Sequence, residues 1–72
     1  MNESEINGKY LEILVEAFKE NKEISCYGQI LRVDKNENGT LVATFLKESN
    51  QNFGENERLI KEAIKNDRIK LI

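Results

Sequence analysis

The 72-residue chain has no histidine, no proline and no tryptophan, and its only cysteine is Cys26. Histidine is the commonest general base and transition-metal ligand, so a serine or cysteine nucleophile would lack its usual partner. A single cysteine can neither form an internal disulfide nor assemble an ordinary zinc site. We therefore expect no enzyme activity, no metal site and no cofactor.

Long apolar runs are also absent. The N-terminal segment carries the acids Glu3 and Glu5, where a secretory signal peptide would carry positive charge followed by apolar residues. No segment approaches the roughly 20 apolar residues of a membrane-spanning helix. Together with the single cysteine, this composition indicates a soluble protein of the reducing cytoplasm.

Glycine is scarce, and the four glycines stand apart from one another, so the chain has no glycine-rich phosphate-binding loop. One of them ends the run DKNENG at residues 34–39, which matches the first half of a calcium-binding loop. The position that requires a bidentate glutamate in such a loop holds Phe45. We therefore interpret the run as a hairpin loop closed by Asn38 and Gly39, with Gly39 in the left-handed conformation.

The residues on either side of this loop are rich in β-branched, aromatic and aliphatic side chains. They predict two strands, at residues 24–33 and 40–47. The apolar side chains do not keep to one face, because the neighbours Ile30 and Leu31 are both apolar and point in opposite directions. This pattern suggests either a bulge near Gly28 or a sheet that is apolar on both faces.

Two amphipathic segments flank the hairpin and predict helices at residues 4–21 and 54–66. In each, apolar residues recur at intervals of three and four, which places them on one helical face. We expect Asn21 to end the first helix in the left-handed conformation, and Asn52 with Glu55 to form a capping box before the second. The predicted core faces comprise Ile6, Tyr10, Ile13, Leu14, Ala17 and Phe18 in the first helix and Leu59, Ile60, Ala63 and Ile64 in the second.

A short strand at residues 68–72, with Ile69 and Leu71 on its core face, completes the order α-β-β-α-β. The sequence thus predicts a single α+β domain, residues 1–72, with a three-stranded, mainly antiparallel sheet and two helices on one face. The last strand has two placements: beside the first and antiparallel to it, giving order 3-1-2, or beside the second and parallel to it. We prefer 3-1-2, because short antiparallel sheets better tolerate one open face.

The open face of this sheet is a candidate interaction surface. Two helices cover only one face, and we expect Tyr27, Val42 and Leu46 on the other. An exposed apolar patch of this kind is unusual for a small monomer. It predicts a homodimer in which a second copy covers the patch, or a docking site for a different protein.

A second candidate surface is the polar side of the first predicted helix, where Glu12, Glu16 and Glu20 follow one another at spacings of four. Like charges at this spacing repel each other by roughly 0.2–0.5 kcal/mol per pair. The three glutamates are either a solvated helix face that tolerates the repulsion or a ridge that meets a basic partner.

Two functions of different class remain open. The first is a small acidic, non-enzymatic protein-interaction module, such as an inhibitor or regulator of a larger protein. The second is a nucleic-acid-binding domain that uses the sheet face, with Tyr27 stacking on bases and Arg32, Lys47, Arg68 and Lys70 contacting the backbone. The net charge of −2 at pH 7 favours the protein partner, because a polyanion requires an electropositive surface.

Overall fold

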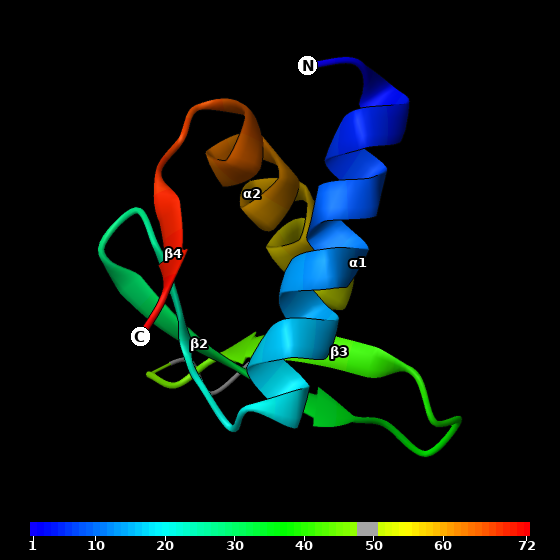
Figure 1. Cartoon of the computed structure of the whole chain (residues 1–72). Helices are drawn as coiled ribbons and strands as arrows, with labels where there is room; N and C mark the ends of the chain where they lie inside the picture. Colours follow the sequence, from blue (N-terminus) through cyan, green and yellow to red (C-terminus); the bar gives the residue numbers. More distant parts are fainter. Residues whose placement is uncertain (48–50) are drawn as a thin grey trace.

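The computed structural model describes residues 1–47 and 51–72 of the chain. Its elements are α1 (Glu3–Lys19), β1 (Ile24–Cys26), β2 (Gln29–Lys35), β3 (Leu41–Phe45), α2 (Phe53–Lys65) and β4 (Ile69–Leu71). Within these residues four strands form one antiparallel sheet in the order β3-β2-β1-β4, and both helices pack on one side of it (Figure 1). The prediction of a small α+β domain with two helices and an antiparallel sheet is confirmed.

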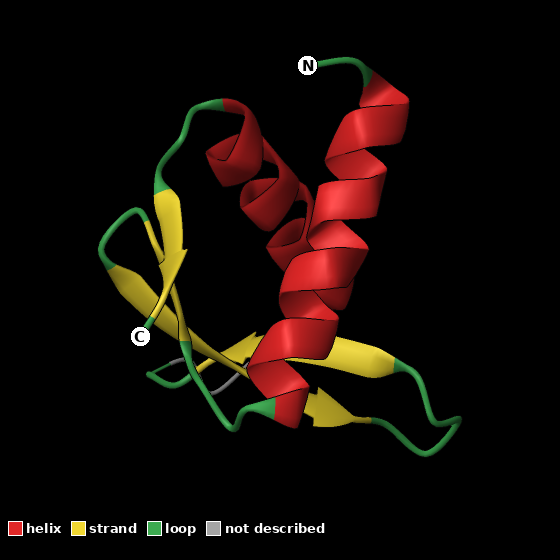
Figure 2. Ribbon diagram, in the orientation of Figure 1, coloured by secondary structure: helices red, strands yellow, loops and turns green. Residues whose placement is uncertain are grey.

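The prediction of three strands is wrong, because a tight turn divides the predicted strand at residues 24–33 into β1 and β2. Tyr27 and Gly28 have positive φ angles of 51° and 78°, and the turn places Cys26 opposite Gln29. Two residues with positive φ between paired strands are typical of the shortest hairpins. What the sequence suggested as a bulge near Gly28 is therefore a complete reversal of the chain, visible beside β4 in Figure 2.

This turn accounts for the change of parity along the predicted strand. After the reversal Ile24 lies opposite Leu31, and both side chains are fully buried against the helices. Val33 and Ala43, which are paired across β2 and β3, continue the same buried face. The buried apolar residues of β1, β2 and β3 therefore lie on the one face of the sheet that contacts α1 and α2. The sheet does not need to be apolar on both faces.

The last strand pairs with β1 in the antiparallel sense, with Leu71 opposite Ile24 and Ile69 opposite Cys26. This agrees with the preferred placement beside the first predicted strand, and the alternative, parallel to the second predicted strand, is wrong. The remaining difference is that the predicted strand at residues 24–33 forms two strands, so that β2 lies between β1 and β3. The buried core between helices and sheet consists of Leu14, Ala17, Ile24, Cys26, Leu31, Val33, Ala43, Ile60, Ala63 and Ile64.

Both helices end in the same way. Asn21 has the expected left-handed conformation, with φ of 54°, and the N–H of Lys22 donates to the carbonyl oxygen of Ala17 over 2.8 Å. After α2, Asp67 has φ of 56°, and the following amide donates to the carbonyl oxygen of Ala63, also over 2.8 Å. This is the Schellman arrangement, here built with asparagine and aspartate in place of the usual glycine.

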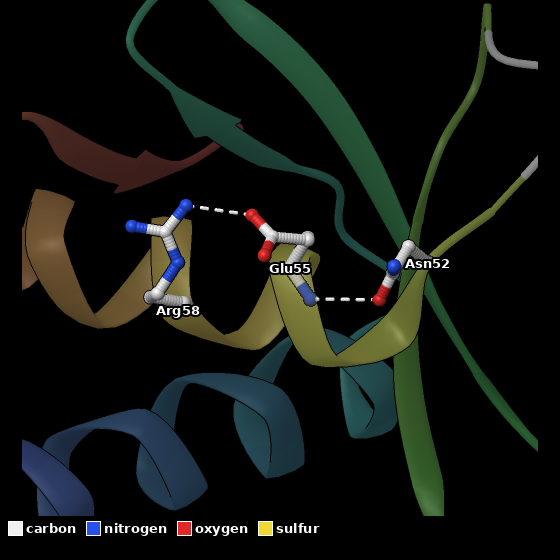
Figure 3. Close-up of polar contacts among 3 residues, drawn as sticks. All are labelled: Asn52, Glu55 and Arg58. Atoms are coloured by element: carbon white, nitrogen blue, oxygen red, sulfur yellow. Dashed lines mark hydrogen bonds and ion pairs between the residues drawn. The ribbon is translucent and has the colours of Figure 1, made fainter.

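The start of α2 differs from the predicted capping box. The Asn52 Oδ1 accepts a hydrogen bond from the N–H of Glu55 over 3.1 Å, as expected (Figure 3). The Glu55 carboxylate, however, accepts a bond of 2.6 Å from Nη2 of Arg58, one turn further along the helix (Figure 3). The cap is therefore made by the asparagine side chain, and the glutamate stabilises the first turn through an ion pair and the helix dipole.

The side chain of Asn36 helps to close the loop between β2 and β3, together with two backbone hydrogen bonds. The Asn36 Oδ1 accepts hydrogen bonds from the N–H groups of Asn38 and Thr40, each over 3.0 Å. Gly39 has φ of 79°, which agrees with the predicted left-handed position. An oxygen that a calcium loop would direct at the ion is thus used to hold the hairpin together.

Candidate interaction surface

The chemistry available to the described residues is limited. Among residues 1–47 and 51–72, no three His, Cys, Asp or Glu side chains are placed to hold a metal ion. In the same part of the chain, neither helix is long and apolar enough to cross a membrane. The Cys26 side chain is fully buried, and this burial raises the pKa of its thiol, so the reactive thiolate is disfavoured.

The structure brings together the three predicted glutamates of α1. Glu12 and Glu16 lie in α1 and Glu20 is its C-cap residue. All three are exposed, and we call them the acidic ridge. Glu20 lies 3.7 Å from the ammonium group of Lys22. In the part of the chain that the structure describes, the ion pairs do not include Glu12 or Glu16.

Beside the acidic ridge lies an apolar row that the sequence analysis missed. The side chains of Leu11, Val15 and Phe18 are 61%, 40% and 38% exposed, and their spacings of four and three place them on one face of α1. We call these three residues the outer stripe. The assignment of Phe18 to the core face is wrong, since its ring lies at the edge of the domain with the Nζ of Lys35 5.5 Å from the ring centroid.

Leu11 and Val15 of the outer stripe form one continuous surface with the acidic ridge. A shallow depression along α1 is lined by Leu11, Glu12, Val15, Glu16, Lys19 and Glu20. The signal for the stripe was present in the sequence, because Leu11 and Val15 fall outside the arc that contains the buried residues Leu14 and Ala17. A helix with apolar residues on more than one face cannot bury all of them against a single sheet.

The three predicted residues of the open sheet face do not form one patch. Leu46 is 46% exposed, and its N–H bonds to the carbonyl oxygen of Ile30, near the β1–β2 turn. Val42 lies opposite Asp34, close to the other end of β2. Between them the outer face carries the polar pair of Arg32 and Thr44.

Tyr27 is the first of the two residues of the β1–β2 turn and directly follows Cys26. Its ring is exposed, but its hydroxyl oxygen accepts a hydrogen bond from Nδ2 of Asn66 over 2.9 Å. This contact ties the turn to the end of α2. This bond gives Tyr27 a structural role within the domain.

The charges on the outer sheet face are mixed. Nη2 of Arg32 lies 3.3 Å from Oε2 of Glu23, which neutralises the cation. Asp34 shares this face with Arg32, and Lys70 lies on it opposite Ser25. The face therefore lacks the uniform positive charge that a nucleic-acid backbone requires.

One edge of the sheet is covered by side-chain amides. Gln51 accepts from the N–H of Phe45 over 3.2 Å and donates to the carbonyl oxygen of the same residue over 3.0 Å, as a neighbouring strand would. The buried Asn56 donates to the carbonyl oxygen of Ala43 over 2.9 Å and to Oε1 of Gln51 over 3.0 Å. These bonds occupy the N–H and carbonyl oxygen of Phe45 and the carbonyl oxygen of Ala43, which are outward backbone groups that pairing with another chain would use.

The α1 surface is thus an exposed region where apolar and charged groups meet in one pattern. Comparisons of the chain with protein-family models, with curated proteins and with solved structures found no match.

Proposed function

We propose that this chain is a non-enzymatic protein-interaction module that binds a larger protein through the outer side of α1. The observation that carries the proposal is the exposure of Leu11 and Val15 directly beside the acidic ridge. Apolar side chains that gather on the surface and are rimmed by charge are typical of protein-binding sites. A module of this size regulates or inhibits its partner by occupying part of the partner's surface.

The small size of the domain adds weight to this proposal. At this length a chain buries only about 60% of the surface that its unfolded form exposes, so apolar side chains are needed in the core. Leu11 is more exposed than any other leucine among the described large apolar residues. Burying a side chain of this type in an interface contributes about 1.5–3 kcal/mol.

The alternative function, nucleic-acid binding through the sheet, has less support. Arg32 and Lys70 do lie on the outer face of the sheet, as that function requires. Arg32, however, is paired with Glu23, Asp34 lies on the same face, and the chain as a whole has a net charge of −2. The salt-dependent attraction that dominates nucleic-acid affinity would therefore be weak.

Self-association is the other binding mode that the sequence predicted. A homodimer through the sheet would have to cover Val42 and Leu46 together with the polar pair of Arg32 and Thr44 between them. Sedimentation across a range of protein concentrations measures this directly. A dimer that persists when Leu11 is changed, and is lost when Val42 or Leu46 is changed to lysine, would place the interface on the sheet.

The experiment that tests the proposed function is affinity capture with matched variants. Leu11→Ser changes the outer stripe, and Leu46→Ser changes a leucine of comparable exposure outside α1. We expect a protein that is captured by the parent and by Leu46→Ser and is lost with Leu11→Ser. The captured protein is then purified and its binding to all three chains is measured by calorimetry.

Circular dichroism establishes that both variants fold like the parent. The proposal is overturned if the parent and the Leu11→Ser variant bind the same proteins with equal affinity. It is also overturned if the material retained by the parent is nucleic acid. In that case nuclease treatment removes the material, and variants of α1 retain it as well as the parent does.

A further inference from the structure

We infer that the segment bound by α1 is a basic amphipathic helix, which lays its apolar side chains on Leu11 and Val15 and its lysine or arginine side chains against the acidic ridge. This inference rests on the proposed function and names the chemistry of the partner. It follows from the shape of the surface, from its charge and from the poor fit of a second copy of the chain.

The shape of the surface suits a helix. From Leu11 to Phe18 the outer stripe extends over about 10 Å of the α1 axis, at about 1.5 Å per residue. Successive rows of side chains on α1 leave the grooves into which the ridges of another helix pack. An extended strand would find no partners there, because the backbone groups in the middle of a helix are already bonded to each other.

The charge of the surface specifies the sign of the partner. Within the described residues, Glu12 and Glu16 do not take part in the ion pairs, so their carboxylates are available to an incoming cation. Their spacing of four makes them repel each other, and a cation placed between them removes this repulsion. Lys19 reduces the negative charge of the depression but leaves three glutamates along its border.

A second copy of the chain fits this surface less well. In a symmetric dimer the same patch meets itself, so the acidic ridge of one copy would face that of the other. Like charges brought together at an interface oppose binding. The exposed leucine and valine of α1 would be buried, but only next to repelling carboxylates.

The probe for this inference is a synthetic helical peptide of about 18 residues, long enough to form a helix on binding. Its leucines are spaced by three and four, and lysine and arginine flank them on both sides. Two control peptides have either the same composition in scrambled order or glutamate in place of every basic residue. Binding to the isotopically labelled protein is followed by shifts of the backbone amide resonances.

We expect the basic peptide to shift resonances of α1 between Leu11 and Glu20, with an affinity that falls as salt concentration rises. Glu16→Lys should weaken binding about tenfold, because it places a like charge under the peptide. Glu37→Lys, in the exposed β2–β3 loop, makes the same change in net charge and should leave the affinity unchanged. Leu11→Ser should also weaken binding, while neither control peptide should shift the α1 resonances.

Several results would overturn the inference. They are absence of binding at millimolar peptide, shifts centred on the sheet, equal weakening by Glu16→Lys and Glu37→Lys, and equal binding of the acidic peptide. A concentration-dependent dimer that is lost with Leu11→Ser would identify a second copy as the occupant instead. None of these results contradicts the proposed function. The capture experiment tests that function separately, and it fails only when capture does not depend on α1.

Discussion

The ammonium group of Lys61 lies 5.2 Å from the centre of the Tyr10 ring and so joins α2 to α1. The same group lies 2.9 Å from Oε2 of Glu57, one turn earlier in α2. Burial, followed by the negative charge of Glu57 and its hydrogen bond with the phenol, raises the pKa of Tyr10 from 10.0 to about 12. The folded domain therefore holds this phenol in its neutral form.

We predict that stability falls with pH in the alkaline range because of Tyr10. The unfolded chain loses the Tyr10 proton near pH 10, and the folded chain holds it until about pH 12. Within this window unfolding releases a proton, so the free energy of unfolding decreases as the pH rises, whereas below it Tyr10 causes no change. Urea denaturation at a series of pH values should show a smaller decrease for Tyr10→Phe, and an equal decrease in both chains would contradict the assignment.

Two glycines should respond to alanine in opposite directions. Gly8 lies inside α1, and among the described atoms none is within 4 Å of the position that a Cβ would take. Gly8→Ala should therefore stabilise the domain by about 1 kcal/mol. Gly28 has a φ of 78° in the β1–β2 turn, where alanine is strained, and Gly28→Ala should destabilise by about 1–2 kcal/mol. Thermal denaturation of the pair distinguishes the two environments, and a stabilising change at Gly28 would disprove the turn.

Cys26 should react with thiol reagents only when the domain opens. Its side chain is fully buried in β1, its Sγ lies 3.9 Å from the carbonyl oxygen of Leu59, and burial raises its pKa. We expect slow labelling in native buffer and rapid labelling in denaturant, with Cys26→Ala giving no signal. Equal rates in both conditions would mean that β1 is not part of a stable core.

The acidic ridge should reduce stability in the free domain. Glu16→Lys removes repulsion with Glu12 and Glu20 and loses a favourable neighbour in Lys19, so the net gain in unfolding free energy should be about 0.3 kcal/mol. The Glu37→Lys variant serves as the control for net charge. A loss of stability on Glu16→Lys, measured by thermal denaturation, would show that the ridge is held by contacts within the domain.

The helices and the loop at Gly39 could be predicted from sequence because local patterns determine them. Apolar spacings of three and four define α1 and α2, and asparagine marks the end of α1 and the start of α2. The turn at Tyr27 and Gly28 could not be recognised in this way. Tyrosine rarely takes a positive φ, and here its hydroxyl and backbone are held by bonds to residues near the end of α2.

The candidate surface was predicted only in part for a related reason. The glutamates of the ridge are visible as a spacing, but the exposure of Leu11 and Val15 depends on which arc of α1 meets the sheet. Similarly, parity placed Val42 on the outer face, whereas its separation from Leu46 by a polar pair depends on the register of β2 and β3. Register and helix rotation are set by the packing of distant segments.

The amides at the β3 edge also set a limit on polymer growth. A filament built by strand pairing needs two usable edges in every unit, one to receive the preceding unit and one to receive the next. On β3, the outward backbone groups of Phe45 and the carbonyl of Ala43 are bonded to Gln51 and Asn56 within the same chain. Pairing another strand along this part of β3 would require these side-chain bonds to break, which disfavours filament growth through the β3 edge.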